Sequence, residues 1–355
     1  MKNKIRVLHL IWGGLGKPGG IQQFCTNLLQ HIDTHEFHFD FAVCDKEHEE
    51  EKNVLPSESI VYRMPWIVGT SGKRAYLAEL KKVLHKQKYD VVHSHLAFMN
   101  ISTLKIAKEC GVPIRISHTH VAGFGNRNSI KNIIKRQLMN YYATKCFACS
   151  HDTAEFYYGV KNKKISVLYS GIEISRFCNS SEKDRNLFVV VARVCPEKSP
   201  EFILDVAEKL YQKNSKLRFL WCGGGDGLSR LEEEASRRMI PIMFRGGGGV
   251  PDVENYLKNA SYMLMPSKKE GFGMAAVEAQ LSGVLVFASD RVPRDTDLGL
   301  IEYYPLDSAE KWADRILSII DNDDRRKYML KHEKIRDYDI SNLATKVFGA
   351  YKNEW

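Results

Sequence analysis

Two carboxylates stand on either side of a glycine-flanked bend in the second half of the chain. Glu270 and Glu278 are separated by seven residues in the stretch KKEGFGMAAVEAQLSG. If a helix begins near Gly271 and runs to about Leu281, the two side chains lie ~12 Å apart along its axis and on roughly the same face. That spacing is too long for the carboxylate pair at ~5 Å that cleaves a glycosidic bond with retention. It suits the two ends of one long ligand, although an acidic helix start with a solvated glutamate gives the same pattern.

Two cations follow another strand-like run. Arg193 and Lys198 lie in VVVARVCPEKSPEF, and Pro200 is suited to the first turn of the helix that follows. A guanidinium and an ammonium group beside a helix N-terminus can hold a diphosphate, although ordinary solvated loops also carry two such charges. Combined with the two carboxylates, these cations fit a nucleotide-sugar, which has a base and ribose, a diphosphate and a hexose.

A glycine-rich segment, GGLGKPGGIQQF, follows the first apolar run and opens an amphipathic stretch. Glycines let the backbone approach a ligand closely, and a helix N-terminus favours an anion. Gly14, Gly16 and Gly19 match the dinucleotide-binding spacing only with Pro18 inside it. We therefore interpret the segment as an anion-facing loop, with a plain glycine-rich turn as the alternative.

Short apolar runs alternate with longer amphipathic stretches along the whole chain. The runs are 5–12, 37–44, 90–95, 113–120 and 145–150 in the first half, and 187–194, 217–224, 242–247, 262–267 and 284–289 in the second. Such runs are typical of strands buried on both faces of a parallel sheet. The strand–helix alternation, repeated twice, predicts an α/β protein with two doubly wound Rossmann-like domains, whose ligands bind at the carboxyl ends of the strands.

The chain length of 355 residues also favours two domains. The polar, turn-rich segment near 170–185 is the expected join, giving an N-terminal domain of 1–175 and a C-terminal domain of 176–325. Residues 310–350 have the apolar spacing of helices, and a helix of about 325–355 is expected to pack back on the N-terminal domain.

Charge is divided unevenly between the halves. Residues 1–170 hold 24 Lys and Arg against 14 Asp and Glu, a net +10, whereas residues 171–355 hold 28 against 29, a net −1. An anionic partner is therefore expected at the N-terminal half, and no nucleic-acid motif is present. The cysteines are scattered, and those in apolar runs favour small buried hydrophobes in a reducing cytosol: Cys44, Cys146, Cys149 and Cys222. No apolar run approaches the ~20 residues of a membrane span.

One basic stretch has two interpretations. NRNSIKNIIKRQLMNYYATK, residues 126–145, has the spacing of a helix with four large apolar residues on one face: Ile130, Ile133, Ile134 and Leu138. The first interpretation is a helix packed on the core with a wet basic side. The second is a surface that faces an anionic membrane, with Lys131, Lys135 and Arg136 beside the apolar face.

Taken together, these motifs resemble the retaining glycosyltransferases of family 4, which have the GT-B fold. The resemblance rests on PSKKEGFG before and EAQLSG after the two glutamates, on Arg193 and Lys198, on the glycine loop ending in Gly19 and Gly20, and on VLYSGIEISRF. It covers nearly the whole chain and is closest to bacterial enzymes of capsule and exopolysaccharide biosynthesis. It implies two Rossmann-like domains that face each other across a cleft.

The resemblance also implies roles for single residues. Glu278 would bind the ribose hydroxyls, and Glu270 would face the donor hexose. Arg193 and Lys198 would neutralise the diphosphate. The remaining donor-binding positions would be Gly19, Gly20, Phe272, Gly273 and Met274. His118 would lie near the reacting sugar, with His120 and His95 as neighbouring candidates. Ala192 and Ser170 stand where the family often has glycine and asparagine, which leaves the identity of the donor open.

The implied activity is transfer of a hexose or N-acetylhexosamine from a nucleotide-sugar, with UDP preferred, to a polysaccharide-precursor acceptor that is glycan- or lipid-diphosphate-linked. The resemblance implies retention of configuration, no metal and no cofactor, because Arg and Lys do the neutralising. Two alternatives share the architecture: a sugar-nucleotide 2-epimerase and a non-catalytic sugar-nucleotide-binding subunit. The expected location is the cytoplasm, at or away from the inner face of the cell membrane, with no nucleic-acid partner.

Overall fold

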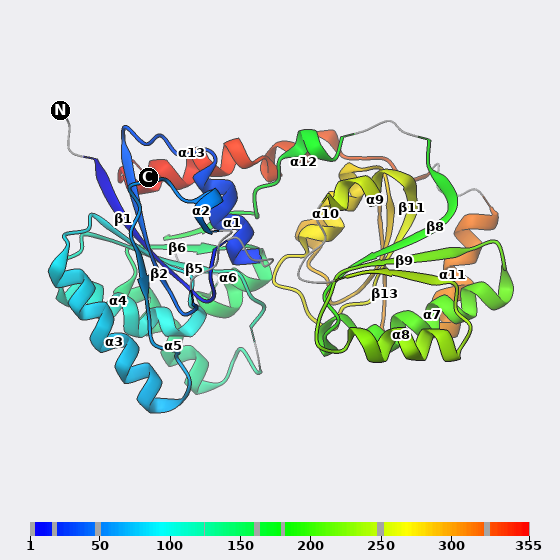
Figure 1. Cartoon of the computed structure of the whole chain (residues 1–355), viewed down its shortest axis with the longest axis horizontal. Helices are drawn as coiled ribbons and strands as arrows, with labels where there is room; N and C mark the ends of the chain where they lie inside the picture. Colours follow the sequence, from blue (N-terminus) through cyan, green and yellow to red (C-terminus); the bar gives the residue numbers. More distant parts are fainter. Residues whose placement is uncertain are drawn as a thin grey trace. The chain divides into compact units, whose positions relative to one another are not determined.

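The computed structural model describes residues 4–15, 20–46, 51–123, 125–159, 164–178, 182–246, 252–322 and 327–354. The chain divides into two compact units (Figure 1). Unit 1 comprises Met1–Gly171 and Asp337–Trp355, and unit 2 comprises Ile172–Arg336. The last segment of the chain therefore belongs to the same unit as the first strand.

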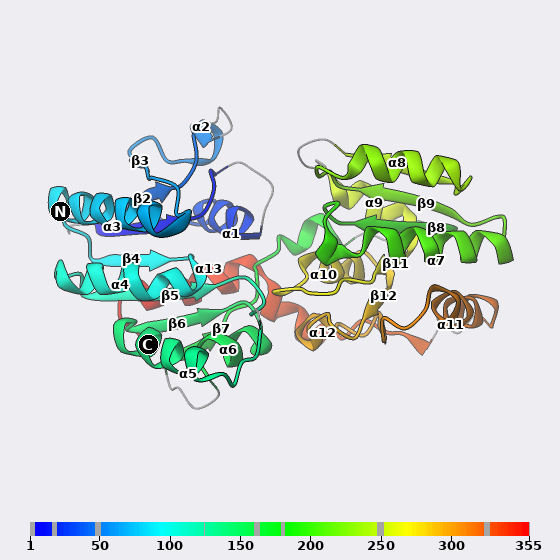
Figure 2. The ribbon, with the colours of Figure 1, turned by 90° about the horizontal axis from the view of Figure 1, so that it is seen from below.

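Within its described residues, unit 1 has a sheet of seven strands in the order β3-β2-β1-β4-β5-β6-β7, and every neighbouring pair is parallel. Figure 2 shows β4, β5, β6 and β7 side by side. The strands are β1 (Ile5–Ile11), β2 (Phe37–Val43), β3 (Val61–Arg63), β4 (Val91–Ser94), β5 (Ile114–Thr119), β6 (Lys145–Ala148) and β7 (Ile165–Val167). The order reverses between β1 and β4, where ligands of doubly wound sheets bind.

Helices cover both faces of this sheet because alternate strand residues point to opposite sides. From β1, Leu8 and Leu10 join the core under α3 and α4, whereas Val7 and Ile11 join the core under α1 and α13 (Figure 1). The helices of unit 1 are α1 (Gly20–Leu29), α2 (Glu51–Val54), α3 (Gly69–Lys86), α4 (Asn100–Glu109), α5 (Ile130–Tyr142), α6 (His151–Tyr157) and α13 (Ile340–Tyr351).

Unit 2 repeats the plan. Its described residues form a sheet of six strands in the order β10-β9-β8-β11-β12-β13, again with every pair parallel. The strands are β8 (Asp184–Val191), β9 (Arg218–Cys222), β10 (Ile242–Arg245), β11 (Ala260–Met265), β12 (Leu285–Ser289) and β13 (Ile301–Tyr304). Its helices are α7 (Pro200–Lys213), α8 (Leu228–Arg237), α9 (Val253–Asn259), α10 (Met274–Leu281), α11 (Ala309–Asp321) and α12 (His332–Ile335). Here the strand order reverses between β8 and β11.

The predicted α/β architecture with two doubly wound sheets is confirmed, and each of the ten predicted strands is present. Three strands at the sheet edges were not predicted: β3, β7 and β13. Two predicted helices differ in extent. The helix after Glu270 begins at Met274 rather than Gly271, and residues 310–350 are divided among α11, α12, a short 3-10 turn and α13. Among the described residues, no helix combines the length and the apolar character that crossing a membrane requires.

Candidate functional site

Glu270 lies in the loop between β11 and α10, not on the helix. Its carboxylate forms an ion pair with the ammonium group of Lys198 and accepts a hydrogen bond of 2.8 Å from the hydroxyl of Ser267. The Glu270 side chain is 9 % exposed and that of Lys198 is 21 % exposed, so this pair is largely withdrawn from water. Lys198 was expected to lie with Arg193 at a diphosphate. The structure joins it to Glu270.

The two loops that carry this pair are adjacent because β8 and β11 are neighbouring strands. Lys198 ends a short 3-10 turn, Pro196–Lys198, which follows β8. The backbone N–H of Lys268 donates a hydrogen bond of 2.8 Å to the carbonyl of Glu197 and so ties the two loops together. The pair therefore stands at the point where the strand order of unit 2 reverses.

Arg193 also follows β8, but its side chain is exposed and forms no ion pair with any residue that the structure describes. An exposed guanidinium just past the end of β8 is available to an anion. The structure thus assigns the two predicted cations different surroundings, one engaged with a carboxylate and one open to solvent.

The start of α10 depends on Gly273. Its φ is +101°, and a β-carbon there would lie 3.3 Å from Met265 Cε. Phe272 is buried just before it, and Met274 is the first helical residue. Further along the helix, the buried amide of Gln280 donates to the carbonyl of Thr296 at 2.7 Å and accepts from the N–H of Leu298 at 2.9 Å. These contacts fix the position of the helix that carries Glu278.

Glu278 is partly buried on α10. Desolvation raises the pKa of its carboxyl to about 7, although the nearby guanidinium of Arg176 acts in the opposite direction. Arg176 is itself held by Glu254, with a nitrogen–oxygen distance of 2.9 Å. The negative charge of Glu254 also favours the protonated form of Glu278. A carboxyl group poised in this way can exchange its proton for hydrogen bonds from a ligand.

Of the glycine loop, the structure describes the residues up to Leu15 and from Gly20 onward. Gly19 lies outside the described residues. Gly20 is the first residue of α1, and no described atom lies within 4 Å of where its β-carbon would be. The backbone at Gly20 is therefore open on that side.

His118 lies in β5 and is fully buried. Its Nδ1 is 3.1 Å from Nε2 of His93, and its own Nε2 has no hydrogen-bond partner among the described residues. Burial, reinforced by the neighbouring imidazoles His120, His95 and His9, holds the pKa of His118 well below its ordinary value. The side chain is therefore a neutral imidazole at pH 7.

His118 belongs to a larger group of histidines, of which only His95, His118 and His120 were predicted as candidates. The register pairs His9 with His93 and Ser94 with Ser117. Because side chains on the same face recur at every second residue, His9, His93, His95, His118 and His120 all lie on one face of the sheet. The repeated pattern His-x-His on two successive strands could have revealed four of them. His9 could be assigned to the group only once the pairing of β1 with β4 was known.

Two sets of three histidines are close enough to be considered as metal ligands: His9, His93 and His95, and His95, His118 and His120. In each set the ligand nitrogens lie within 4.8 Å of one another. However, several of these nitrogens already face each other at hydrogen-bond distance, as in the 2.9 Å contact of His95 Nδ1 with His120 Nε2. In this arrangement the imidazoles are therefore hydrogen-bonded to one another, with an N–H on one side of each contact and a lone pair on the other.

Helix α5 packs on the core through Met139, but the apolar face predicted for residues 126–145 is not the face that it buries. Ile130 is 77 % exposed and Ile134 is 50 % exposed, and the residues that the helix buries are Asn132 and Met139. The helix has three cations and no acidic residue. An apolar face turned to solvent between lysines is unusual for a protein that contacts only water.

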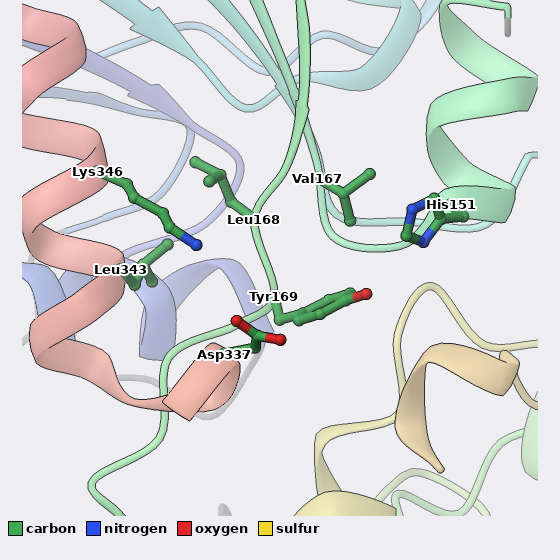
Figure 3. Close-up of a pocket in the computed structure, with 7 residues that line it drawn as sticks. All are labelled: His151, Val167, Leu168, Tyr169, Asp337, Leu343 and Lys346. Carbon is green, nitrogen blue, oxygen red and sulfur yellow. The ribbon is translucent and has the colours of Figure 1, made fainter. Parts of the chain in front are cut away.

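Unit 1 also contains a pocket of about 230 Å³ that none of the predicted site residues lines. Figure 3 shows Lys346 of α13 and His151 of α6 on opposite sides of it, with Tyr169 and Asp337 between them. The lining is of mixed charge. The pocket is lined in part by α13, and the same helix packs on the face of the sheet where His118 lies.

The chain matches two family models. The model described as Glycosyl transferases group 1 matches residues 171–336, and the model described as Glycosyltransferase Family 4 matches residues 18–176. Together they span nearly the whole chain, and each covers mainly one of the two units.

Similar proteins point the same way. The chain is 27 % identical over 318 residues to the UDP-Gal:alpha-D-GlcNAc-diphosphoundecaprenol alpha-1,3-galactosyltransferase of Escherichia coli, covering 76 % of this chain and 80 % of the relative. It is 26 % identical over 284 residues to the capsular polysaccharide biosynthesis glycosyltransferase CapH of Staphylococcus aureus, covering 74 % and 77 %. The structure of HepE from Anabaena, solved with UDP and glucose, aligns with a TM-score of 0.76 at 16 % identity over 98 % of this chain and 99 % of that one, which shows a shared fold.

Proposed function

The chain belongs to the family 4 glycosyltransferases of the GT-B fold, and from this premise we propose that it transfers a hexose or N-acetylhexosamine from a UDP-sugar to a lipid-linked precursor of a surface polysaccharide. The enzyme class and the link to capsule and exopolysaccharide enzymes follow from the family and its relatives. The donor, the acceptor and the course of the reaction are the proposal.

The observation that carries the proposal is the pairing of Glu270 with Lys198 on the two loops that follow β8 and β11. These loops meet where the strand order reverses, the place at which doubly wound sheets bind nucleotides. A carboxylate, an ammonium group and the exposed guanidinium of Arg193 thereby all lie at the carboxyl ends of β8 and β11. The backbone N–H groups at the start of α10 supply further donors for an anion.

In the proposed mechanism, the donor diphosphate binds at Arg193, Lys198 and the N-terminus of α10, near Phe272, Gly273 and Met274. The two cations stabilise the charge that builds up on the leaving nucleotide diphosphate, a type of contact worth about 3–4 kcal/mol in the transition state. The ammonium group of Lys198 then interacts with both the diphosphate and the carboxylate of Glu270. Glu270 faces the hexose, where positive charge develops at the anomeric carbon. The reaction proceeds with retention and without a metal ion.

Glu278 binds the ribose hydroxyls, and His118 donates a hydrogen bond to the donor. These assignments follow the family pattern. They are supported by the burial of Glu278 and His118 and by the open backbone at Gly20.

For the acceptor, we propose that α5 rests on an anionic membrane. Its exposed isoleucines would enter the interface while Lys131, Lys135 and Arg136 contact lipid phosphates. Desolvation lowers the pKa of Lys135, and the charges of Lys131 and of Lys73 on α3 act in the same direction, so Lys73 adds to the same field. This arrangement would bring the enzyme to a lipid-diphosphate acceptor.

The test is a product assay with the purified chain. Candidate UDP-sugars are first ranked by the rise in melting temperature that each produces, because a bound ligand stabilises the native state by mass action. The best donor is then incubated with polyprenyl-diphosphate-linked sugar acceptors. Free UDP together with an α-linked product from an α-linked donor supports the proposal. An epimerised donor, or donor binding without any product, contradicts it.

A further inference from the structure

A line of buried hydrogen-bonding groups leads from the C-terminal helix to His118. The hydroxyl oxygen of Tyr351, on α13, lies 2.7 Å from Nδ1 of His93. Nε2 of His93 lies 3.1 Å from Nδ1 of His118. All three side chains are at most 1 % exposed. Nε2 of His118 ends this line without a partner among the described residues.

A second branch begins at the same hydroxyl. The oxygen of Tyr351 lies 3.4 Å from Nε2 of His9, and Nδ1 of His9 lies 3.1 Å from Nε2 of His95. Nδ1 of His95 in turn lies 2.9 Å from Nε2 of His120. One tyrosine hydroxyl therefore joins two chains of imidazoles, one ending at His118 and the other at His120.

Each imidazole in these chains is neutral, since desolvation lowers the pKa of His9 to about 3 and holds that of His93 well below its ordinary value. A neutral imidazole has one N–H and one lone pair, so the hydrogen bond at one nitrogen dictates which group the other nitrogen presents. In a line of such rings, the tautomer of the first ring therefore determines the tautomer of each ring that follows.

Tyr351 makes that choice because its hydroxyl has a single proton. Bonds donated by O–H groups are typically about 0.2 Å shorter than those donated by N–H groups. The 2.7 Å contact to His93 Nδ1 fits an O–H donor, whereas the 3.4 Å contact to His9 Nε2 is long for either direction. With Nδ1 of His93 accepting, its Nε2 carries the proton and donates to Nδ1 of His118. The remaining proton of His118 must then be on Nε2.

We propose that Tyr351, acting through His93, is a positioning residue that fixes His118 as its Nε2–H tautomer, so that the buried Nε2 presents a hydrogen-bond donor. A buried N–H without a partner is costly, and an oxygen of a bound ligand would satisfy it. The identity of that ligand rests on the proposed function, in which it is the nucleotide-sugar. An anionic or hydroxyl oxygen is attracted by N–H and repelled by the lone pair of the other tautomer.

The inference can be tested on the tautomer itself, without any substrate. The full chain is labelled with ¹⁵N-histidine, and the His118 resonances are identified by their loss in a His118→Gln variant. One-bond and multiple-bond ¹H–¹⁵N spectra then show which nitrogen carries the proton. We expect Nε2–H in the wild type and a shift of at least half of the population to Nδ1–H in Tyr351→Phe. Tyr89→Phe is the matched control, because it also removes a buried hydroxyl of unit 1, one that is bonded to Asp40 at 2.8 Å.

Kinetics provide a second, independent readout. Tyr351→Phe should reduce kcat/KM for the donor by tenfold or more, and Tyr89→Phe should leave it within twofold. His93→Leu interrupts the same line, so the double variant with Tyr351→Phe should be no slower than the slower single variant. Melting curves of all variants show whether they are folded.

A wild-type His118 protonated at Nδ1 overturns the inference, and so does an unchanged tautomer in folded Tyr351→Phe. Absence of transfer in the wild type refutes the proposed function but leaves the tautomer result standing, so the two failures are distinguishable.

Discussion

Lys198 and Glu270 form an ion pair between the loops that follow two neighbouring parallel strands of unit 2, with both side chains at least three-quarters buried. Ser267 also donates to the carboxylate of Glu270, at 2.8 Å. The cation expected at the diphosphate and the carboxylate expected at the hexose therefore act on each other before any donor arrives. Their contributions to catalysis should be coupled.

The first prediction concerns this coupling. Lys198→Ala should lower transfer by about a hundredfold or more, because a leaving diphosphate loses one of its stabilising charges. Glu270→Gln should lower kcat by tenfold or more while donor affinity by calorimetry stays within a few-fold, since its charge acts mainly in the transition state. The double variant should lose less than the product of the two single losses, because each single variant also leaves the other partner's charge uncompensated.

Lys268→Ala is the matched control, since Lys268 is exposed in the same loop and only its backbone contacts Glu197. Its kinetics should match those of the wild type. Strictly multiplicative losses in the double variant would show that Lys198 and Glu270 act separately during turnover.

The positions of the site residues of unit 2 could be predicted from the sequence where residues close together in the chain determine them. Lys198 could be placed at the carboxyl end of a strand, because a buried strand precedes it and a helix-starting proline follows it within a few residues. The partner of Lys198 could not be predicted, because Glu270 is 72 residues away and reaches it only through the adjacency of β8 and β11. The same limit applies to His118, which is linked to a tyrosine near the C-terminus.

Local patterns were misleading at two places. The bend before Glu278 was expected to be helical from Gly271, but Gly273 has a positive φ and the helix starts after it. The shared helical face proposed for Glu270 and Glu278 therefore does not exist. In α5 the apolar spacing was correctly assigned to a helix, yet spacing alone cannot show whether an apolar face meets the core or solvent.

A second prediction tests the exposed face of α5. The purified protein should float with vesicles that contain phosphatidylglycerol at low salt and should be released as salt rises, because surface charges are screened. Replacing Lys131, Lys135 and Arg136 by Gln should abolish this flotation, because each cation contributes up to ~1 kcal/mol to the free energy of membrane binding. Replacing Ile130 and Ile134 by Ser should weaken it through loss of apolar insertion.

Met239→Ser is the control for that experiment, since Met239 is 83 % exposed but lies in unit 2. It should float like the wild type. Equal binding to neutral and anionic vesicles would argue against the proposed role of the cations.

A third prediction concerns metals. In the proposed mechanism Arg193 and Lys198 neutralise the leaving diphosphate, so transfer should persist at an undiminished rate after exhaustive dialysis against EDTA, in buffer that contains no added divalent ion. Elemental analysis of the dialysed protein provides the control by showing whether the treatment removed all transition metal. Loss of activity that zinc or manganese restores would establish a metal requirement and contradict the proposed mechanism.

The last prediction follows from the raised pKa of Glu278. In the protein without donor, the carboxyl titrates at about 7 because desolvation disfavours its charged form. Two ribose hydroxyls donate hydrogen bonds best to the ionised carboxylate, so binding must displace the proton wherever Glu278 is protonated. Below pH 7 the donor KM should therefore rise, approaching tenfold per pH unit, and above pH 7 it should be constant. Calorimetry at pH 6 in buffers of different ionisation enthalpy should show release of up to one proton on binding.

The same residue should affect stability with the opposite dependence on pH. A carboxyl whose pKa is higher in the folded than in the unfolded state stabilises the fold below its unfolded pKa of about 4.5, and that contribution is lost as the pH rises through 7. Glu278→Gln cannot ionise, so its free energy of unfolding relative to the wild type should increase between pH 5 and pH 8, by about 1–3 kcal/mol. Urea unfolding at the two pH values measures this change. The Glu278→Gln variant should also lose the dependence of donor KM on pH, and a variant that kept it would assign the titration to another group.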